Sequence, residues 1–506
     1  MIILTLFLLF LPLALILSEI VRKRRYSKLP PGPAVWPLLG NVFHFISKKL
    51  PKHEIIAEMS EKYGDVFTVW FFTKPVVILS SLDAVRQAYI HRREDFASRP
   101  DTLVAVGLFD GYHNDLSFGR YTEKWKAKRK LFHHSVRSLI ATKQFELEIN
   151  HITQKIITEM LEAGPESAFD IQSFIHKAYY NASLVLAFGK RFEFDEPEFL
   201  RFVEMHHDAN QGISVCRFYD SFPFLHYVPI FHLSPALRSM KRAVKHLQNY
   251  LLRWFVEARQ NESADEKENM VQALANGVNR AEVKADGAES SEMFTNEEIM
   301  HMLMNLFTAT TIPTSSATLW LLLEMILHPE IQEKCYEDLQ KVTAGRPISL
   351  SDRAHLPYVE ACIMEALRHY SPISLNLPHT PSSDAPLRDY MIPAGTETIM
   401  NIWALHHDPK SWKDPNNYNP NNFLDENGQL VRPLCFLPFG AGRRVCPGDA
   451  FAKNLIFLTF TQMLQHLRLE RVPGCEYSTQ WSHISSEFVN IPEAYPVKVV
   501  ARSKRE

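Results

Sequence analysis

Residues 436–448, which read FLPFGAGRRVCPG, decide how this chain is interpreted. The glycines let the backbone turn tightly beneath a flat ligand. Cys446 stands just ahead of a final helix predicted from about Asp449 to His466, and the N-terminus of a helix stabilises a thiolate. Arg444 adds positive charge nearby. A stabilised thiolate in a dry loop is the axial ligand that a haem iron needs, and thiolate donation favours O–O cleavage.

The stretch resembles the haem-binding signature of the cytochrome P450 superfamily. The matching residues are Phe439, Gly442, Arg444, Cys446 and Gly448, five fixed types over ten positions. The resemblance covers nearly the whole chain and is closest to the microsomal branch, which hydroxylates drugs, arachidonate and steroids. It implies haem b as the cofactor, Cys446 as the axial iron ligand, and the other four residues as parts of the haem-binding loop.

A buried ion pair is the second feature that the resemblance implies. Glu365-Ala366-Leu367-Arg368 is similar to the E-x-x-R motif of the family, and its spacing puts both charged side chains on one helix face. Asn422 stands where many relatives carry arginine. We therefore expect the Glu365–Arg368 pair to lose its usual third partner. The segments FGKR, residues 188–191, and WALHHDP, residues 403–409, support the microsomal placement.

Four further residues resemble the groups that hold the haem propionates in the family. Trp125 and Arg129 lie four residues apart on a basic helix. His379 follows Leu-Pro, as in the microsomal branch, and Arg99 is a further candidate. Two or three cations would neutralise two buried carboxylates.

The long central helix, expected over residues 296–328 with Thr295 as its cap, departs from the family. Where relatives show an acid followed by an alcohol, this chain has Ile312 and Pro313. In the family these two residues relay protons during oxygen activation, whereas isoleucine carries no proton and proline has neither hydroxyl nor N–H. Proline should also kink the helix and free a carbonyl group that water could use. Thr311 and Thr314 are the remaining candidates for catalysis, although both point away from position 313 and could instead satisfy local carbonyls.

Three functions remain open. The first is a haem-thiolate monooxygenase that takes electrons from NADPH through a flavoprotein reductase and uses water or a substrate hydroxyl as the proton relay. The second is an isomerase or dehydratase that rearranges lipid hydroperoxides or endoperoxides without activating O2. The third is a haem protein that binds an apolar ligand without turnover.

The pattern predicts one mainly α-helical body with a minor β part, an α+β catalytic domain over residues 42–506. DVFTVWFFTKPVVILS, residues 65–80, indicates a hairpin, and short strands are expected within residues 380–402. Most of residues 82–343 has helical spacing, while residues 261–293 are polar and predict a surface connection. Residues 408–438 predict an ordered loop.

Residues 1–21 predict a membrane anchor, because Ile2 to Leu17 carry no charge and basic residues 22–25 follow. Residues 22–41 add this basic stop and a proline-rich hinge. Basic residues after the apolar run stay cytosolic, so we expect a single-pass protein of the endoplasmic reticulum membrane with a cytosolic catalytic domain. The alternative is a cleaved secretory signal, which would make the sequons at Asn181 and Asn261 usable.

The partners follow from charge and composition. The chain has 506 residues and a formal net charge of -2, so nothing indicates nucleic-acid binding. Six cysteines are too sparse for a disulfide framework and show no zinc spacing. The basic residues of 124–130 could attract an acidic reductase. The family resemblance implies that residues 214–231 lie over the substrate entrance near the bilayer and that 104–108 and 305–309 line the pocket. The aromatic residues of 214–231 suit a membrane interface and favour a lipophilic substrate. Steroid, fatty acid and foreign compound all remain open.

Overall fold

A computed structural model describes residues 19–20, 24–46, 48, 50–102, 115–164, 168–220, 235–260, 268–284, 295–480 and 489–502. Nearly all of the predicted anchor (1–21) lies outside these residues, as does the pocket segment 104–108. The predicted aromatic entrance (214–231) has no described side chains either. The expectations on these segments stay predictions.

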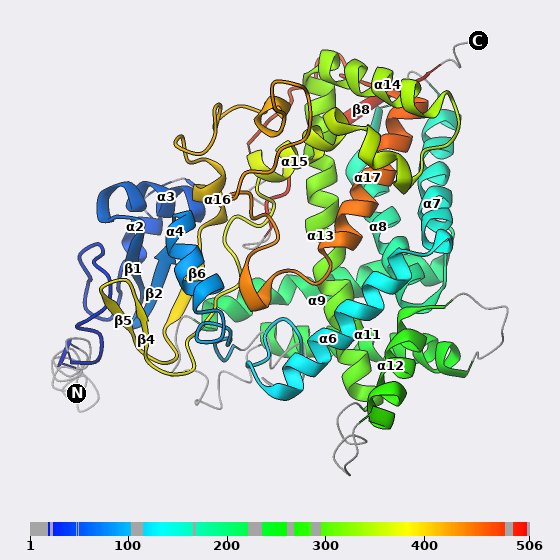
Figure 1. Ribbon diagram of the computed structural model, residues 1–506. Helices are drawn as coiled ribbons and strands as arrows, with labels where there is room; N and C mark the ends of the chain where they lie inside the picture. The colour runs from blue at the N-terminus through cyan, green and yellow to red at the C-terminus, as the bar shows by residue number, and fades with distance from the viewer. Residues whose placement is uncertain are drawn as a thin grey trace, which may run out of the picture.

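Helices form most of the structure, and strands make a smaller part beside them (Figure 1). The helices, with η marking short 3-10 or π helices, are α2 (Val42–Ile46), α3 (Lys52–Tyr63), α4 (Leu82–Val85), η1 (Arg86–His91), α6 (Glu123–Ile140), α7 (Lys143–Glu162), α8 (Ile171–Phe188), α9 (Pro197–Asp220), α11 (Pro235–Gln260), α12 (Met270–Lys284), α13 (Asn296–Leu327), α14 (Pro329–Thr343), η3 (Leu350–His355), α15 (Pro357–His369), α16 (Ile402–His406), η4 (Pro420–Phe423), η5 (Gly442–Arg444) and α17 (Asp449–His466). The predicted mainly helical fold is confirmed.

The strands pair over long sequence distances. They are β1 (Val66–Phe71), β2 (Lys74–Leu79), β3 (Ala168–Asp170), β4 (Ala385–Leu387), β5 (Tyr390–Ile392), β6 (Glu397–Met400), β7 (Leu467–Glu470) and β8 (Pro496–Ala501). The predicted hairpin is β1–β2, antiparallel with Val66 opposite Leu79. β6 joins β2 in parallel, from Val76 opposite Glu397 to Leu79 opposite Met400. β6 is an edge strand of this sheet, and His379 lies beside it through an isolated antiparallel bridge to Thr398.

Helix α13 runs through the middle of the helical part, beside α17 (Figure 1). Thr295 caps it as predicted, since its hydroxyl accepts the N–H of Glu298 while the Glu298 carboxylate accepts the N–H of Thr295. The helix packs against α8, α15 and α17, and its side chains are buried almost all round. Among the described residues it alone has the length and composition to span a membrane, and its burial marks it as a core helix.

One predicted surface connection is partly wrong. Within residues 261–293 the structure has α12 (Met270–Lys284), and Met270, Val271 and Leu274 on it are fully buried. These apolar residues have helical spacing that the polar composition around them hid.

The sequon at Asn181 is unsuited to glycosylation as folded. Asn181 is 1% exposed, donates from Nδ2 to the Phe192 carbonyl at 2.6 Å and accepts the Phe192 N–H at 3.0 Å. The amide therefore fixes the segment that follows α8.

Candidate functional site

The loop of residues 439–448 doubles back on itself before α17. The N–H of Cys446 donates to the Phe439 carbonyl at 2.9 Å, which closes the loop. Gly440 and Gly442 have φ of 80° and 74°, a left-handed conformation that favours glycine. A Cβ at Gly442 would also overlap the carbonyl oxygen of Tyr89 on η1. The predicted glycine turn is thus required both by conformation and by space.

The Cys446 thiol is partly buried, and its surroundings only partly favour ionisation. Burial raises the pKa of the thiol, while the Gly448 N–H and the Arg129 guanidinium lower it. The N-terminus of α17 was expected to stabilise a thiolate, but burial outweighs that effect. A coordinated cation deprotonates a thiol outright, so the sulfur of Cys446 suits a metal ligand better than a free nucleophile.

Two buried arginines next to this loop donate to different carbonyls of one turn. Arg444 donates to the carbonyls of Ala97 at 2.7 Å, Leu116 at 3.2 Å and Gly119 at 2.6 Å. Arg99 donates to the carbonyls of Ser117 at 2.9 Å, Leu377 at 2.7 Å and Pro378 at 2.8 Å. Residues 115–119 are therefore the turn on which both guanidinium groups meet.

Helix α6 contributes the predicted Trp125 and Arg129 to the same cluster. The Trp125 Nε1–H donates to the Leu116 carbonyl at 3.1 Å, and the Arg444 guanidinium lies 3.7 Å from the Trp125 ring centroid. Arg129 donates to the Val445 carbonyl, directly before Cys446. The four-residue spacing thus places both side chains against the cysteine loop and its arginines.

His379 joins the cluster as a neutral ring. Its Nδ1 lies 2.9 Å from the Phe96 carbonyl, which can only accept, so Nδ1 carries the proton. Burial, together with the charges of Arg99 and Arg444, holds the pKa of His379 well below its usual range. The ring stacks on Tyr89 with centroids 4.1 Å apart. His379 thus supplies a hydrogen-bonding group, and the positive charge comes from the arginines.

The cluster has the charge to bind a dianionic group such as the two propionates of haem. The pKa of Arg99 is lowered to about 10 and that of Arg444 well below its usual value, chiefly by burial and in part by neighbouring guanidinium groups. Arg129 is the third cation. The two buried guanidinium groups of Arg99 and Arg444 and the partly exposed one of Arg129 repel one another unless anions lie among them, so these residues fit haem.

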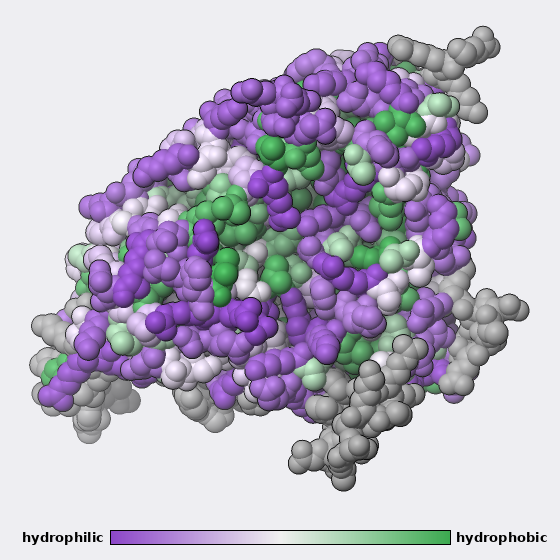
Figure 2. Space-filling view, in the orientation of Figure 1, coloured by the Kyte–Doolittle hydropathy of each residue, from purple (hydrophilic) through white to green (hydrophobic). Residues whose placement is uncertain are grey.

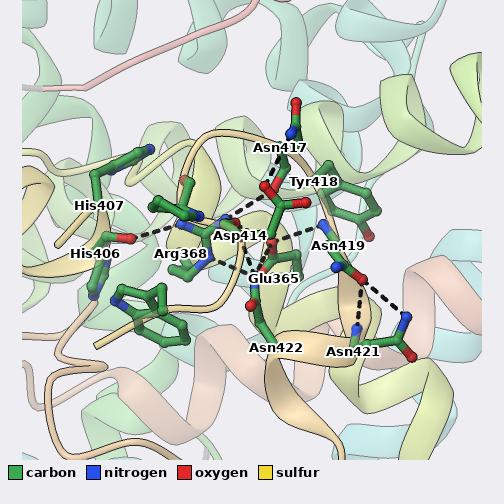
Figure 3. Close-up of polar contacts among 12 residues, drawn as sticks. Glu365, Arg368, His406, His407, Asp414, Asn417, Tyr418, Asn419, Asn421 and Asn422 are labelled. Carbon is green, nitrogen blue, oxygen red and sulfur yellow. Dashed lines mark hydrogen bonds and ion pairs between the residues drawn. The ribbon is translucent and has the colours of Figure 1, made fainter. Parts of the chain in front are cut away.

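The E-x-x-R pair is fully buried and saturated with hydrogen bonds (Figure 3). Arg368 Nη2 and Nε donate to the two Glu365 carboxylate oxygens at 2.6 and 2.7 Å. Further Arg368 N–H groups donate to the carbonyls of His406 at 2.7 Å, Pro415 at 2.8 Å and Asn417 at 3.1 Å. The pair therefore fastens α15 to the end of α16 and to the loop that precedes η4.

The expected loss of a third partner is wrong. Asn422 donates from Nδ2 to Glu365 Oε1 at 3.1 Å, and the Asn419 N–H reaches the same oxygen at 2.9 Å (Figure 3). A neutral amide and a backbone N–H replace the cation that many relatives carry. Burial still raises the pKa of Glu365 despite these donors.

His406, which the sequence did not single out, connects this pair to the cysteine loop. Its Nε2 accepts the Leu437 N–H at 3.1 Å, and its Nδ1 lies 2.7 Å from the Ser371 hydroxyl. Ser371 in turn donates to the Arg368 carbonyl at 2.8 Å. The only sequence signal was two adjacent histidines in residues 403–409.

The accessible face of α13 carries no acidic group. In the middle of the helix, Ala309 is exposed and Thr308, Ile312 and Pro313 are partly exposed, whereas residues 298–307 before them and 314–326 after them are buried. These positions cover about 140° of the helix surface at 100° per residue. The acid and the alcohol of the family are therefore absent from positions 312 and 313 of this face, where Thr308 is the residue with a hydroxyl.

The predicted threonines lie off this face. Thr311 is 1% exposed, and its hydroxyl has no hydrogen-bond partner among the described residues. Thr314 is 5% exposed. Two other threonines of α13 satisfy local carbonyls: Thr310 donates to Leu306 at 2.7 Å and Thr318 to Thr314 at 3.2 Å. A catalytic role for Thr311 or Thr314 stays a prediction that this placement does not favour.

The pocket stretch expected over residues 305–309 is only partly accessible. Thr308 and Ala309 face accessible space, whereas Asn305, Leu306 and Phe307 are buried. Asn305 instead accepts the Ser117 N–H at 3.2 Å, which joins α13 to the arginine-binding turn.

The basic stretch of α6 is less free than its sequence suggests. Lys128 is 1% exposed and pairs with Glu298 at 2.8 Å, and Lys124 pairs with the same carboxylate at 2.6 Å. Lys126 pairs with Glu123 at 2.7 Å. Part of the positive charge expected to attract a reductase is thus balanced within the protein, and the attraction itself stays a prediction.

Comparisons with known proteins agree with this geometry. A family model described as Cytochrome P450 matches residues 30–499. The chain is 29% identical to cytochrome P450 2B4 of Oryctolagus cuniculus over 95% of each protein, and 29% identical to cytochrome P450 2U1 of Homo sapiens over 88% of this chain and 84% of the relative. A solved structure described as zebra fish cytochrome P450 with progesterone superposes with a TM-score of 0.78 at 26% identity, covering 90% of this chain and 100% of that chain.

Proposed function

The chain belongs to the cytochrome P450 family and is a monooxygenase of that family, and we propose that it inserts one oxygen atom from O2 into a lipophilic substrate. We propose that the electrons come from NADPH through a flavoprotein reductase. The observation that carries this proposal is the convergence of Cys446 with the buried guanidinium groups of Arg99 and Arg444 and the partly exposed one of Arg129.

Each predicted residue has a role in this proposal. Cys446 ligates the iron. Arg99, Arg129, Arg444, Trp125 and His379 hold the propionates; Phe439, Gly442 and Gly448 shape the loop; Glu365 and Arg368 fasten its surroundings. When bound, the haem supplies the reductive activation of oxygen, which a thiolate ligand favours.

Electron entry is favoured on the cysteine side. Val445, next to Cys446, is 40% exposed, so the ligand loop lies close to the protein surface. Figure 2 shows apolar side chains in a hollow near the centre of one face, with hydrophilic side chains around it. Because the lysines of α6 are partly neutralised, we propose that apolar contact contributes to reductase docking beside charge.

The membrane arrangement is part of the proposal. We propose an anchor at residues 1–21, a basic stop and hinge at 22–41 and a catalytic domain at 42–506, in the endoplasmic reticulum membrane with the domain cytosolic. The described part of the hinge is not a free linker. The carbonyls of Pro30 and Pro31 accept from the Thr68 hydroxyl and N–H, each at 2.8 Å, and Asn41 accepts the Trp70 N–H at 2.8 Å. Docking on β1 would fix the direction in which an anchor leaves the domain.

The substrate is proposed to be apolar, with a steroid as one candidate. The solved relative carries progesterone in its description, and the accessible face of α13 is lined by Ala309, Ile312 and Pro313. A screen of steroids, fatty acids and foreign compounds for substrate-induced spin shifts would separate these classes.

The decisive test has two stages. Reduced protein with carbon monoxide should absorb at the long Soret wavelength of a thiolate ligand, and Cys446→Ala should abolish that band. Persistence of the band in the variant would overturn the assignment. Incubation with NADPH, reductase and labelled O2 should then place label in the product.

One observation favours a second activity at the same site. The accessible face of α13 offers no acid, and Ile312 and Pro313 cannot relay protons. An isomerase or dehydratase of lipid hydroperoxides needs no proton delivery to oxygen. Rapid conversion of a lipid hydroperoxide without NADPH, and no label from O2 in the products, would favour this activity.

A further inference from the structure

Asp115 begins the turn, residues 115–119, that accepts hydrogen bonds from the arginines, and the sequence motifs do not include it. Its carboxylate Oδ1 accepts the N–H groups of Ser117 at 2.7 Å and Phe118 at 2.6 Å. This hydrogen bonding shapes residues 115–119 into a turn. The carbonyls of that turn accept from Arg99, Arg444 and Trp125. Asp115 therefore orients the acceptors on which three proposed cofactor-holding residues converge.

The second oxygen of the same carboxylate is buried and unpaired. Asp115 is fully buried, and Oδ2 has no hydrogen-bond partner in the described part of the chain. No ion pair of Asp115 occurs among the described residues either, and the guanidinium groups of Arg444 and Arg99 act on it from farther away. An asparagine would build the same turn without a buried charge, so the turn alone does not explain an acid here.

The titratable groups around Asp115 are accounted for. Burial raises the pKa of Asp115 to about 6, while backbone N–H groups and the charges of Arg444 and Arg99 oppose that rise. Lys128 also lies within electrostatic reach, but it is paired with Glu298. Asp449 acts on Arg129, but it pairs with Lys453 at 3.1 Å and lies 3.8 Å from Arg137. Asp115 is therefore the carboxylate without an ion pair that faces the guanidinium cluster in the described part of the chain, and with a pKa of about 6 it is ionised at pH 8.

The positive charges of the guanidinium cluster explain why an acid stands at position 115. Arg99, Arg129 and Arg444 contribute three positive charges and Asp115 one negative charge, which leaves two. The two propionates of haem carry two negative charges. With haem bound, the buried group is neutral only if Asp115 is ionised, and neutrality matters in a medium of low dielectric constant.

We propose that Asp115 is a positioning and charge-balancing residue of the haem pocket: it orients the turn that receives Arg99 and Arg444, and its charge cancels the excess of one guanidinium over the propionates. This inference rests on the proposed function, because it requires haem with its propionates in this cluster. It predicts that Asp115 sets the reduction potential of the iron without touching the substrate.

The test compares neutral variants that keep the turn with one that does not. Asp115→Asn retains an acceptor for the Ser117 and Phe118 N–H groups and removes only the charge, and Asp115→Ser does the same through a shorter hydroxyl. Each variant is purified as the full-length holoprotein, and its reduction potential is measured at pH 8 by spectroelectrochemistry. Loss of a negative charge near the iron favours the added electron. We expect the reduced-to-oxidised ratio at fixed potential to rise about tenfold, which is about 59 mV for one electron.

The controls separate the two roles. Asp115→Ala removes the acceptor as well, and it should in addition speed transfer of haem to an apomyoglobin acceptor severalfold over Asp115→Asn. Asp101→Asn removes an exposed carboxylate that pairs with Arg120, and it should leave the potential unchanged.

Two results must be kept apart. If wild-type protein gives no thiolate spectrum, the proposed function fails. If wild type gives that spectrum and the neutral variant that folds has an unchanged potential, the charge-balancing role of Asp115 is wrong.

Discussion

The cysteine side and the central helix α13 differ in how closely they follow the family. Around Cys446 every residue of the family motif is present, and the candidate cofactor-holding residues lie together in one cluster. On the accessible face of α13, two residues essential to the usual proton relay are replaced by Ile312 and Pro313. The comparison shows that holding a haem and delivering protons are separate properties of this fold, because different elements carry them.

The largest expected effect concerns the cysteine side. It tests whether haem binding there depends on the buried Glu365–Arg368 pair. Arg368→Ala leaves the fully buried Glu365 carboxylate without its cation, which costs about 3–5 kcal/mol. We expect little or no haem-loaded protein, measured by the carbon monoxide spectrum of the purified variant. Arg353→Ala, which breaks the more exposed pair with Glu360, is the matched control and should retain haem. Equal haem content in the two variants would contradict this account.

The second prediction concerns α13, where two substitutions would restore the residues that the family carries. Ile312→Glu combined with Pro313→Thr restores the acid and the alcohol. We expect hydrogen peroxide release per NADPH consumed to fall by about tenfold or more, because general acid–base groups contribute at least that much to proton transfer. Pro313→Ala restores the helix N–H without a hydroxyl and serves as the control. Peroxide release that is unchanged in the double variant would mean that the missing relay does not limit turnover.

A third prediction concerns a buried acid at the end of α13. Burial raises the pKa of Glu324 to about 7, although the Tyr370 hydroxyl and His328 oppose the rise. Because the folded protein then binds this proton more tightly than the unfolded chain, the free energy of unfolding falls as pH rises from about 4.5 to about 7. Glu324→Gln should remove that loss and be more stable than wild type at pH 8 by about 1–3 kcal/mol, with a smaller gain at pH 5. Urea unfolding at the two pH values measures the difference, and a gain that does not depend on pH would contradict the prediction.

The smallest expected effect concerns the Asn422 amide beside the buried Glu365–Arg368 pair. Asn422→Ala removes one of the donors to Glu365 and should lower the free energy of unfolding by about 1 kcal/mol. Denaturant unfolding checks this value. The neighbouring Asn421→Ala, at an exposed residue that does not contact Glu365, should change stability by less than about half that amount.

Local motifs were predictable from the sequence because their geometry is local. The glycine turn around Cys446, the Glu365–Arg368 spacing and the Thr295 cap depend on residues within a few positions of one another. Lys128 could also have been placed: it follows Trp125 by three residues and precedes Phe132 by four, which puts it on the buried face of α6.

Contacts between distant segments could not be predicted in this way. The pairing of β2 with β6, the Asn422 amide beside Glu365 and the link from His406 to Leu437 all join separate parts of the chain. Asp115 was missed for a related reason. Its local pattern indicates only a turn, and its importance arises from the arginines that the fold brings to that turn.

Gly442 determines how closely η1 packs against the cysteine loop. Its lack of a side chain lets η1 approach until the Tyr89 carbonyl occupies the space that a Cβ would need. The Tyr89 ring lies flat against His379, so a methyl group at position 442 would displace both aromatic rings together. The space at position 442 thus admits a hydrogen atom but not a methyl group. A substitution there would also shift side chains that are not bonded to the loop.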